Sequence, residues 1–582
     1  MPRFADPPAP TPELLAAARA EAPADLLLAG ARVVNVFTLD IEPAHVAIVG
    51  DRIARVSPER CEAKETVDFA GMILAPGFID AHVHIESTMR PPSLFAPIAV
   101  ARGNTGCVAD PHEIANVLGV AGIEWMMRDA ERAPMNIMWG ASSCVPSCHL
   151  ENSGATVTAE DLAPLFASDR VVALAEMMNF PGVVHADPNV LEKIALGLRE
   201  RLVDGHAPGV RGDWLQAYAA SGISSDHEST TADEAREKLA AGLRVFIREG
   251  SASHNLEALL PIVTERTFRR ICFCTDDRHL SDLVDDGQID HVVRKAIALG
   301  LDPAMAIAMG SFSTAEHFRL PARGAIAPGY IADLVAYDNL HELRARRVWF
   351  EGTLVAQDGD YLGEQPSTLD PPPSGVTLPS DLDESALQLD PIAPGASIRV
   401  IGMDPTSLVT EHLTMPASTN EAGRPVADPA RDILKITVIE RHRGTGNIGL
   451  GFVRGFRFSG GAIASTVGHD AHNLAVVGDN DHDMLVAARA LADAGGGQCV
   501  VKSGIVQALL PLEIAGLMTS APDALERQRA LLDAARALGC PHHDPFMPLS
   551  FLPLPVIPSL KISDLGLVDV EKFEVVGLLA EG

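Results

Sequence analysis

Two histidines separated by one residue, His82 and His84, end an apolar run that reads FIDAHVH. In a β-strand, residues i and i+2 point to the same side, so both imidazoles should lie on one face. Neutral imidazoles are good ligands for zinc, manganese and iron. The spacing therefore predicts metal binding at the end of a strand.

Four more groups of the same kind follow other apolar runs that are predicted to be strands. They are Glu176 in VVALAEMM, His206 in LVDGHAPG, His227 in ISSDHES and Asp276 in ICFCTDD. Taken singly, each has an ordinary explanation, such as a satisfied core histidine, a loop carboxylate or a helix cap. Their shared position at strand ends favours one common site.

Four imidazoles and two carboxylates exceed what a single four-coordinate ion with an open position needs. Two ions that share a bridging carboxylate fit the number better, and we expect Glu176 to be the bridge. Paired cations lower the pKa of bound water from 15.7 to about 7, which makes hydroxide available at neutral pH. We expect Asp276 to accept the proton of this hydroxide and to pass it to the leaving group.

The elements that must position these groups alternate between short apolar runs and helical stretches. The predicted strands are 78–84, 105–110, 136–142, 171–177, 201–206, 222–227, 243–249 and 271–276. Helical patterns include 232–241 and 289–298. Strands that alternate with helices in this way predict an α/β fold, a (β/α)₈ TIM-like barrel over residues 76–320. In such barrels the functional residues lie at the carboxyl ends of the strands.

The rest of the chain divides into four further parts. They are an N-terminal helical extension (1–24), a small split β-sandwich (25–75 plus 321–360), a linker rich in Pro, Ser and Asp (361–397) and an additional C-terminal α/β domain (398–582). Within the sandwich, residues 25–36 and 46–56 are predicted strands. Residues 11–22 form the predicted helix, and 484–494 form another in the C-terminal domain.

Composition limits the class of protein. The net charge of −31 argues against a nucleic-acid partner, and 47% hydrophobic residues allow a large core. Eight cysteines in 582 residues suggest no disulfide framework, and Cys272 and Cys274 are expected to be buried. No signal peptide or membrane-spanning run is recognisable, so we expect a cytoplasmic protein with no membrane partner. We also expect it to form a homo-oligomer.

The motif PGFIDAHVHIE, together with the later strand-end histidines and aspartate, resembles the amidohydrolase superfamily. IAPGYIADLVAYD resembles the split β-sandwich of that superfamily. Within it, HIESTMRPPSLFAPIAVARGNTGCVADPHEIANVLG, AEMMNFPGV and the stretch from GFVRGFRFSGG to GHDAHN look like the adenine deaminases. Hydantoinases and dihydroorotases use a carboxylated lysine at the strand-4 position. Because no lysine lies between Val171 and Phe180, that branch is disfavoured.

The resemblance implies hydrolysis of adenine to hypoxanthine and ammonia, a reaction of purine salvage. It implies two divalent ions, usually manganese or iron, with zinc as an alternative. The ligands carried over are His82, His84, Glu176, His206, His227 and Asp276. Hydroxide would add to C6 of the purine, ring N1 would take a proton, and the exocyclic amine would leave as ammonia.

Spacing does not identify the acid that protonates N1, and Glu86 is one candidate. Residues that could contact the purine are Asp110, His112 and Glu113 in ADPHE, and Ser251 and His254 in GSASHNL. An additional ion at ADPHE, or hydrogen bonding and capping within its loop, is the alternative. In the C-terminal region, GHDAHN contains His469, Asp470 and His472. This cluster is either part of the active site or interface, or a polar turn within its own domain.

Three other classes of protein share some of these features. A small zinc deaminase would need H-x-E followed by P-C-x-x-C. His84 and Glu86 supply the first motif, but Cys144 and Cys148 are wrongly spaced for the second, so this class is rejected. Another amidohydrolase acting on a different aminated heterocycle or a cyclic amide stays open, because loops set substrate choice on this fold. A non-catalytic scaffold is disfavoured because every expected ligand is present.

Overall fold

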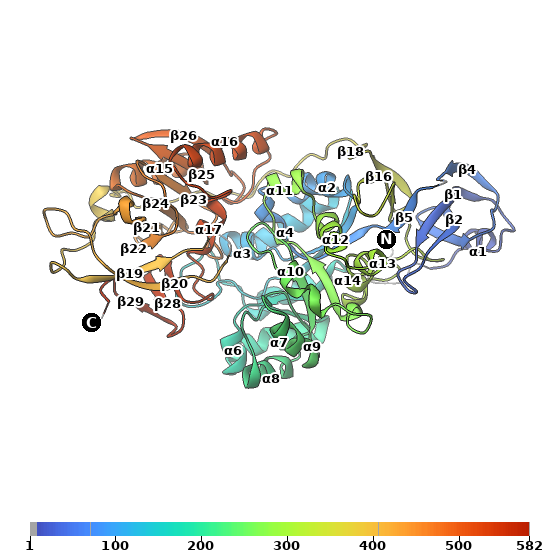
Figure 1. Ribbon diagram of the computed structural model, residues 1–582, viewed down its shortest axis with the longest axis horizontal. Helices are drawn as coiled ribbons and strands as arrows, with labels where there is room; N and C mark the ends of the chain where they lie inside the picture. The colour runs from blue at the N-terminus through green and yellow to red at the C-terminus, as the bar shows by residue number, and fades with distance from the viewer. Residues whose placement is uncertain (1–8, 70, 405–406, 581–582) are drawn as a thin grey trace.

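The computed structural model describes residues 9–69, 71–404 and 407–580. Three parts follow one another along its long axis: an N-terminal sheet, a central barrel and a C-terminal sheet with its helices (Figure 1). The chain leaves the first part, builds the barrel, and returns to the first part before it crosses to the third. None of the described helices has the length and hydropathy that crossing a bilayer requires.

A curled parallel sheet forms the centre of the barrel. Its strands are β6 (Phe78–His84), β7 (Asn104–Ala109), β8 (Asn136–Ala141), β9 (Val171–Met177), β10 (Val203–Gly205), β11 (Ser225–Asp226), β12 (Arg244–Arg248), β13 (Ile271–Cys274) and β14 (Asp276–Asp277). They pair in the orders β10-β9-β8-β7-β6-β14 and β11-β12-β13. β13 and β14 together are the eighth predicted strand, interrupted at Thr275. On the other side, Ser224 N donates to Val203 O at 2.9 Å, which brings β11 beside β10.

These strands are buried on both faces, as expected for a parallel sheet that is covered by helices. Cys272 and Cys274 pack with Ile79, Val108 and Phe246 in one buried cluster, so both behave as small hydrophobic residues. Apolar side chains pack along the earlier part of each strand, and the polar residues lie at the carboxyl ends.

Helices cover the outside of this sheet. They include α2 (Pro92–Val100), α3 (His112–Leu118), α4 (Val120–Asp129), α7 (Pro188–Glu200), α8 (Gly212–Ala220), α9 (Ala232–Ala240), α11 (Leu280–Asp285), α12 (Ile289–Ala298), α13 (Pro303–Met309) and α14 (Phe312–His317). The helices predicted at 232–241 and 289–298 correspond to α9 and α12. The hydroxyl of Thr231 caps α9 by accepting Glu234 N at 3.3 Å.

A mixed sheet, with parallel and antiparallel pairs, combines strands that precede the barrel in the sequence with strands that follow it. Its members are β1 (Ala24–Val34), β2 (Ile41–Val49), β3 (Arg52–Ser57), β4 (Ala63–Asp68), β5 (Ile73–Pro76), β15 (Leu334–Tyr337), β16 (Ala345–Phe350), β17 (Thr353–Gln357) and β18 (Asp360–Tyr361). β5 pairs with β15, which joins the two halves. The predicted helix at 11–22 appears as α1 (Pro12–Ala18). The single strand predicted at 46–56 is wrong, because the chain reverses at Gly50 (φ 59°) and forms the β2–β3 hairpin.

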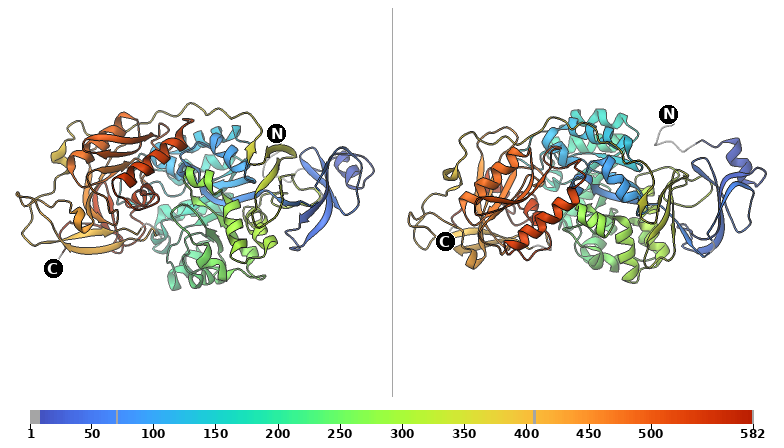
Figure 2. Two further views of the ribbon diagram at one scale, coloured as in Figure 1. Left: turned by 45° about the horizontal axis from the view of Figure 1, so that its top comes forward. Right: turned by 90° about the horizontal axis from the view of Figure 1, so that it is seen from above.

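The segment after β18 runs over the barrel before it enters the C-terminal part (Figure 2). It is fastened to α4: Trp125 Nε1 donates to Asp370 O at 2.9 Å, and Leu369 N donates to Asp129 at 3.0 Å. It contains one short 3₁₀ turn, η6 (Glu384–Leu387), and no strand is assigned between β18 and residue 397. The predicted linker is therefore largely extended chain.

The C-terminal part has a mixed eight-stranded sheet in the order β20-β19-β22-β21-β24-β23-β25-β26. These strands are β19 (Ser397–Gly402), β20 (Glu411–Pro416), β21 (Ile433–Ile439), β22 (Ile448–Arg454), β23 (Ala462–Ser465), β24 (Leu474–Gly478), β25 (Gly497–Lys502) and β26 (Ile505–Pro511). Helices α15 (Asp481–Asp493), α16 (Ala524–Ala537) and α17 (Phe546–Phe551) and the small sheet β27 (Leu560–Ser563), β28 (Gly566–Asp569) and β29 (Glu574–Val576) complete it. The helix predicted at 484–494 corresponds to α15.

Candidate active site

Glu176 lies at the centre of the polar end of the barrel, between two pairs of imidazoles. Its Oε1 is 3.4 Å from His82 Nε2 and 3.2 Å from His84 Nε2. Its Oε2 is 2.7 Å from His206 Nδ1 and 3.2 Å from His227 Nε2. One carboxylate oxygen thus faces each pair, which is the arrangement of a carboxylate that bridges two ions.

Asp276 completes the group on the side of the first pair. Its Oδ1 is 3.0 Å from His84 Nε2 and 3.8 Å from His82 Nε2. The backbone at Asp276 has φ 59°, a conformation that a non-glycine residue rarely adopts, and it occurs where the eighth strand is interrupted. This strained turn aims the carboxylate at the imidazoles. The structure therefore brings all six predicted ligands together.

The donor set fits divalent metal ions. Ligands about 2.0–2.2 Å from an ion lie about 3.0–3.5 Å from one another, and most of the distances above fall in that range. His206 Nε2 and His227 Nε2 are buried and have no hydrogen-bond partner among the described residues, although buried polar atoms are normally paired. His84 Nδ1 is 3.0 Å from Asp110 O, which leaves Nε2 free to ligate.

A buried ion pair that the sequence did not reveal supports the site from β12. Arg248 donates to Asp276 and to Glu228, with an Nη2–Oε2 distance to Glu228 of 2.9 Å. Glu228 is also 3.4 Å from His227 Nε2. Burial acts to raise the pKa of Asp276, but the Arg248 guanidinium and His84 hold it well below its usual range. The carboxylate form of Asp276 is thus favoured.

The ADPHE loop after β7 meets the GHDAHN loop of the C-terminal part. Glu113 accepts from His472 Nε2, and its Oε1 is 2.5 Å from His469 Nδ1. His112 Nε2 is 3.6 Å from Asp470 Oδ1. Burial raises the pKa of Glu113, but the three histidines lower it well below its ordinary value. Of the two interpretations of GHDAHN, the geometry favours a place beside the active site.

Most of these groups, but not His82 or His472, line one cavity of about 20 Å³, which we call the barrel-mouth cavity. Polar walls come from the imidazoles and carboxylates already named. Its apolar cap consists of Leu408, Phe551, Leu554 and Ile557. Phe551 stacks on His469 with ring centroids 4.2 Å apart. None of the four cap residues was identified from the sequence.

Four of the residues predicted for catalysis or substrate binding do not line this cavity. Asp110 lies behind His112, since its Oδ2 is 3.1 Å from His112 Nδ1 and its Oδ1 accepts from the Ser142 hydroxyl at 2.8 Å. Glu86 is buried and does not line the cavity: its Oε1 accepts Ile114 N at 3.3 Å, and burial raises its pKa to about 7. Ser251 and His254 line a separate cavity of about 460 Å³, because the chain turns outward after β12 and Glu249 pairs with His254.

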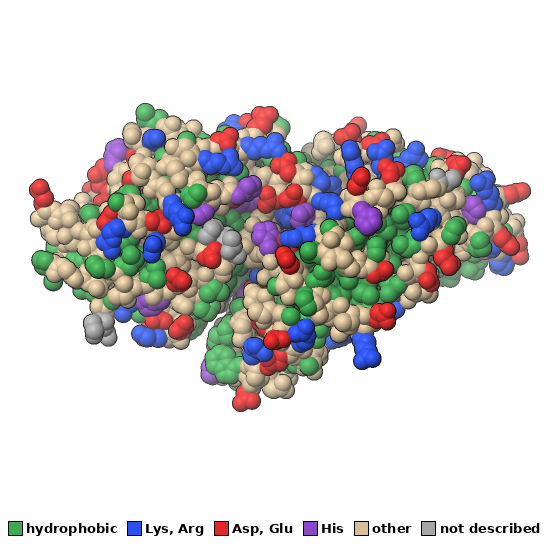
Figure 3. Space-filling model, viewed as in Figure 1, with side chains coloured by type: hydrophobic (Ala, Val, Ile, Leu, Met, Phe, Trp, Pro, Cys, Tyr) green, Lys and Arg blue, Asp and Glu red, His purple; other side chains and the backbone are tan. Residues whose placement is uncertain are grey.

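Histidine side chains also gather on the surface where the barrel meets the C-terminal part (Figure 3).

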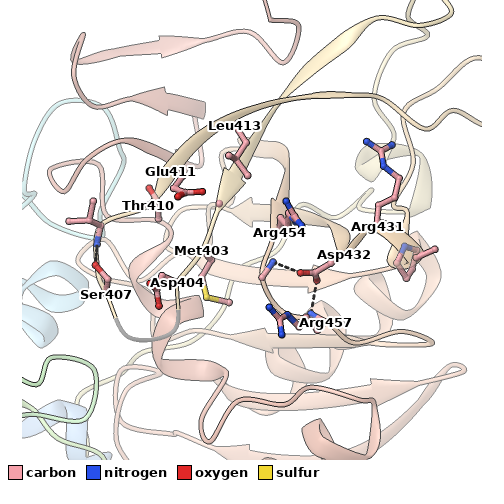
Figure 4. Close-up of a pocket in the computed structure, with 15 residues that line it drawn as sticks. Met403, Asp404, Ser407, Thr410, Glu411, Leu413, Arg431, Asp432, Arg454 and Arg457 are labelled. Carbon is pink, nitrogen blue, oxygen red and sulfur yellow. Dashed lines mark hydrogen bonds between the residues drawn. The ribbon is translucent and has the colours of Figure 1, made fainter.

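A larger cavity, about 1010 Å³, lies among β19, β20 and β22 (Figure 4). It is lined by Arg431, Arg454 and Arg457, and Asp432 accepts the backbone N–H of Arg457 at 2.7 Å. It contains no histidine or cysteine, so the cluster at the barrel mouth is the stronger candidate for catalysis. Size alone does not identify the site.

Comparison with known proteins agrees with this assignment. The amidohydrolase family model matches residues 73–356, which include the barrel and all six residues of the cluster. The fold and the site thus define a metal-dependent hydrolase of the amidohydrolase class. The model of the adenine deaminase C-terminal domain matches residues 407–574.

Three curated relatives span nearly the whole chain. The adenine deaminase of Desulfatibacillum aliphaticivorans is 48% identical over 97% of this chain and 99% of its own. Those of Methanothrix thermoacetophila (44%, over 98% and 99%) and Geobacillus kaustophilus (43%, over 96% and 97%) are similar as well. This chain belongs to the adenine deaminase family.

Proposed function

We propose that this protein hydrolyses adenine to hypoxanthine and ammonia, with two divalent ions held by the six residues around Glu176. The observation that carries the proposal is the position of Glu176, with one carboxylate oxygen toward each pair of imidazoles. The relatives named adenine deaminase support the choice of substrate. The net charge of −31 favours a small-molecule partner over nucleic acid.

Mn²⁺ or Fe²⁺, with Zn²⁺ as an alternative, would supply hydroxide at neutral pH when bound. Asp276 would accept a proton beside C6 of the purine and deliver it to the departing amine. Arg248 would keep Asp276 oriented and ionised between these transfers, because it donates to the carboxylate. Glu113, His469 and Asp470 line the same cavity and would contact the ring nitrogens.

The substrate is tested by incubating the metal-loaded protein with a panel of compounds. The panel contains adenine, other aminated heterocycles and cyclic amides, and ammonia release and purine absorbance are measured. We expect adenine to react with the highest kcat/KM. Reaction with another member of the panel but not with adenine would move the assignment to a different amidohydrolase activity.

A further inference from the structure

The apolar cap of the barrel-mouth cavity is built from two segments outside the barrel. Leu408 precedes β20, whereas Phe551 ends α17 and Leu554 and Ile557 follow it. The cavity of about 20 Å³ holds only about one or two water molecules. A purine can therefore enter only after the cap has moved.

The segment that carries Leu408 is a thin wall between two cavities. Leu408 lines the barrel-mouth cavity, whereas Ser407, Val409 and Thr410 line the cavity of about 1010 Å³ among β19, β20 and β22 (Figure 4). Displacement of this segment would connect the two cavities. The contacts that fix it therefore decide whether the cap is closed.

Lys561 in β27 connects the two segments of the cap. Its Nζ donates to Leu408 O at 2.8 Å and to Phe551 O at 3.0 Å. A parallel connection is made by Thr410, whose hydroxyl donates to Leu560 O at 2.7 Å. One strand thus holds both sides of the cap through backbone carbonyls.

The ammonium of Lys561 is fully buried, and no carboxylate pairs with it in the described ranges 9–69, 71–404 and 407–580. Burial alone lowers the pKa of Lys561 to about 7. A buried ammonium without a carboxylate partner reduces stability. The two carbonyls of the cap are the acceptors that this lysine satisfies.

We propose that Lys561 is a positioning residue that anchors the backbone of the apolar cap, by clamping the carbonyls of Leu408 and Phe551, so that the cap side chains, once they have moved aside to admit the purine, pack against it. This inference rests on the proposed deamination of adenine. The anchored backbone keeps the apolar side chains of the cap beside the purine, so loss of the clamp weakens substrate binding. The groups that carry out the chemistry do not contact Lys561 and are unaffected.

The test compares Lys561→Met with Lys572→Met in the metal-loaded protein. Lys572 is a matched control, because it lies in the same small sheet region, its side chain is 60% exposed and its partner Asp569 is 3.5 Å away. For Lys561→Met we expect KM for adenine to rise about tenfold or more, because the two hydrogen bonds that hold the cap are lost. The value of kcat should stay within about threefold, because the groups that carry out the chemistry do not contact Lys561.

An unchanged KM in folded Lys561→Met overturns the proposal, and so does a lower Tm with kcat and KM both intact, which would mean a purely structural role. If Lys561→Met does not fold, Thr410→Val decides, because it removes the neighbouring link to β27 and is nearly isosteric. We expect its KM to rise about threefold or more, and an unchanged KM overturns the proposal. Absence of adenine turnover in the wild type would instead refute the proposed function.

Discussion

Replacing Lys238 by methionine should destabilise the barrel strongly. Lys238 in α9 is fully buried, and its Nζ is 2.8 Å from both Asp226 and Glu234. It also donates to Ala207 O at 2.6 Å. Methionine is similar in length but has no charge, so Lys238→Met leaves two buried carboxylates without a cation.

Breaking a buried ion pair typically costs about 3–5 kcal/mol. At about 2–4 °C per kcal/mol for a unit of about 150–250 residues, Tm should fall by about 6–20 °C. Two ligands should also be disturbed, because Ala207 directly follows His206 and Asp226 directly precedes His227. The variant should therefore bind metal more weakly than the wild type.

Thermal unfolding followed by circular dichroism and metal content measured after dialysis test both effects. Lys64→Met is the matched control, because Lys64 also pairs with an aspartate, at 2.6 Å, but its side chain is 70% exposed. Exposed pairs contribute less than about 1 kcal/mol, so its Tm should barely change. Equal Tm shifts in the two variants would refute the assignment of Lys238 to a buried, stabilising network.

Three further results are expected. Asp276→Asn should lower kcat by about 10²–10⁴-fold while metal content by mass spectrometry is unchanged; activity within tenfold of the wild type would exclude its role in proton transfer. Burial, together with Asp470, raises the pKa of Glu151 to about 8, so the folded protein retains a proton that the unfolded chain has lost above about pH 4.5. Stability should thus fall by about 1.4 kcal/mol per pH unit up to about pH 8, and Glu151→Gln should flatten this slope in thermal melts; an identical slope would contradict the cause given. His472→Ala removes a hydrogen bond to Glu113 and should lower kcat/KM for adenine about 10–100-fold, whereas unchanged kinetics would separate this loop from the site.

Much of the barrel could be predicted because its signals are local. Each strand is an apolar run with a polar residue at its end, and parallel strands bring those ends together. The six groups around Glu176 were found in this way. The β2–β3 hairpin differs from the single predicted strand because the apolar pattern continues on both sides of Gly50, although Gly followed by Asp is a turn signal.

Residues whose roles depend on distant partners could not be found. Arg248 ends a strand in the sequence like any other residue, and only the adjacent β11 and β13 bring Glu228 and Asp276 to it. Lys561 is separated from Leu408 by 153 positions in the chain, and no periodic pattern encodes that contact.

The central claim is that two ions held around Glu176 are needed to deaminate adenine. The most direct measurement is titration of the metal-free protein with Mn²⁺, with hypoxanthine and ammonia quantified at each step. We expect activity to rise until two equivalents per chain are bound and Glu176→Gln to remove it, because this carboxylate faces both pairs of imidazoles. Full activity at one equivalent, or in the metal-free protein, would contradict the account.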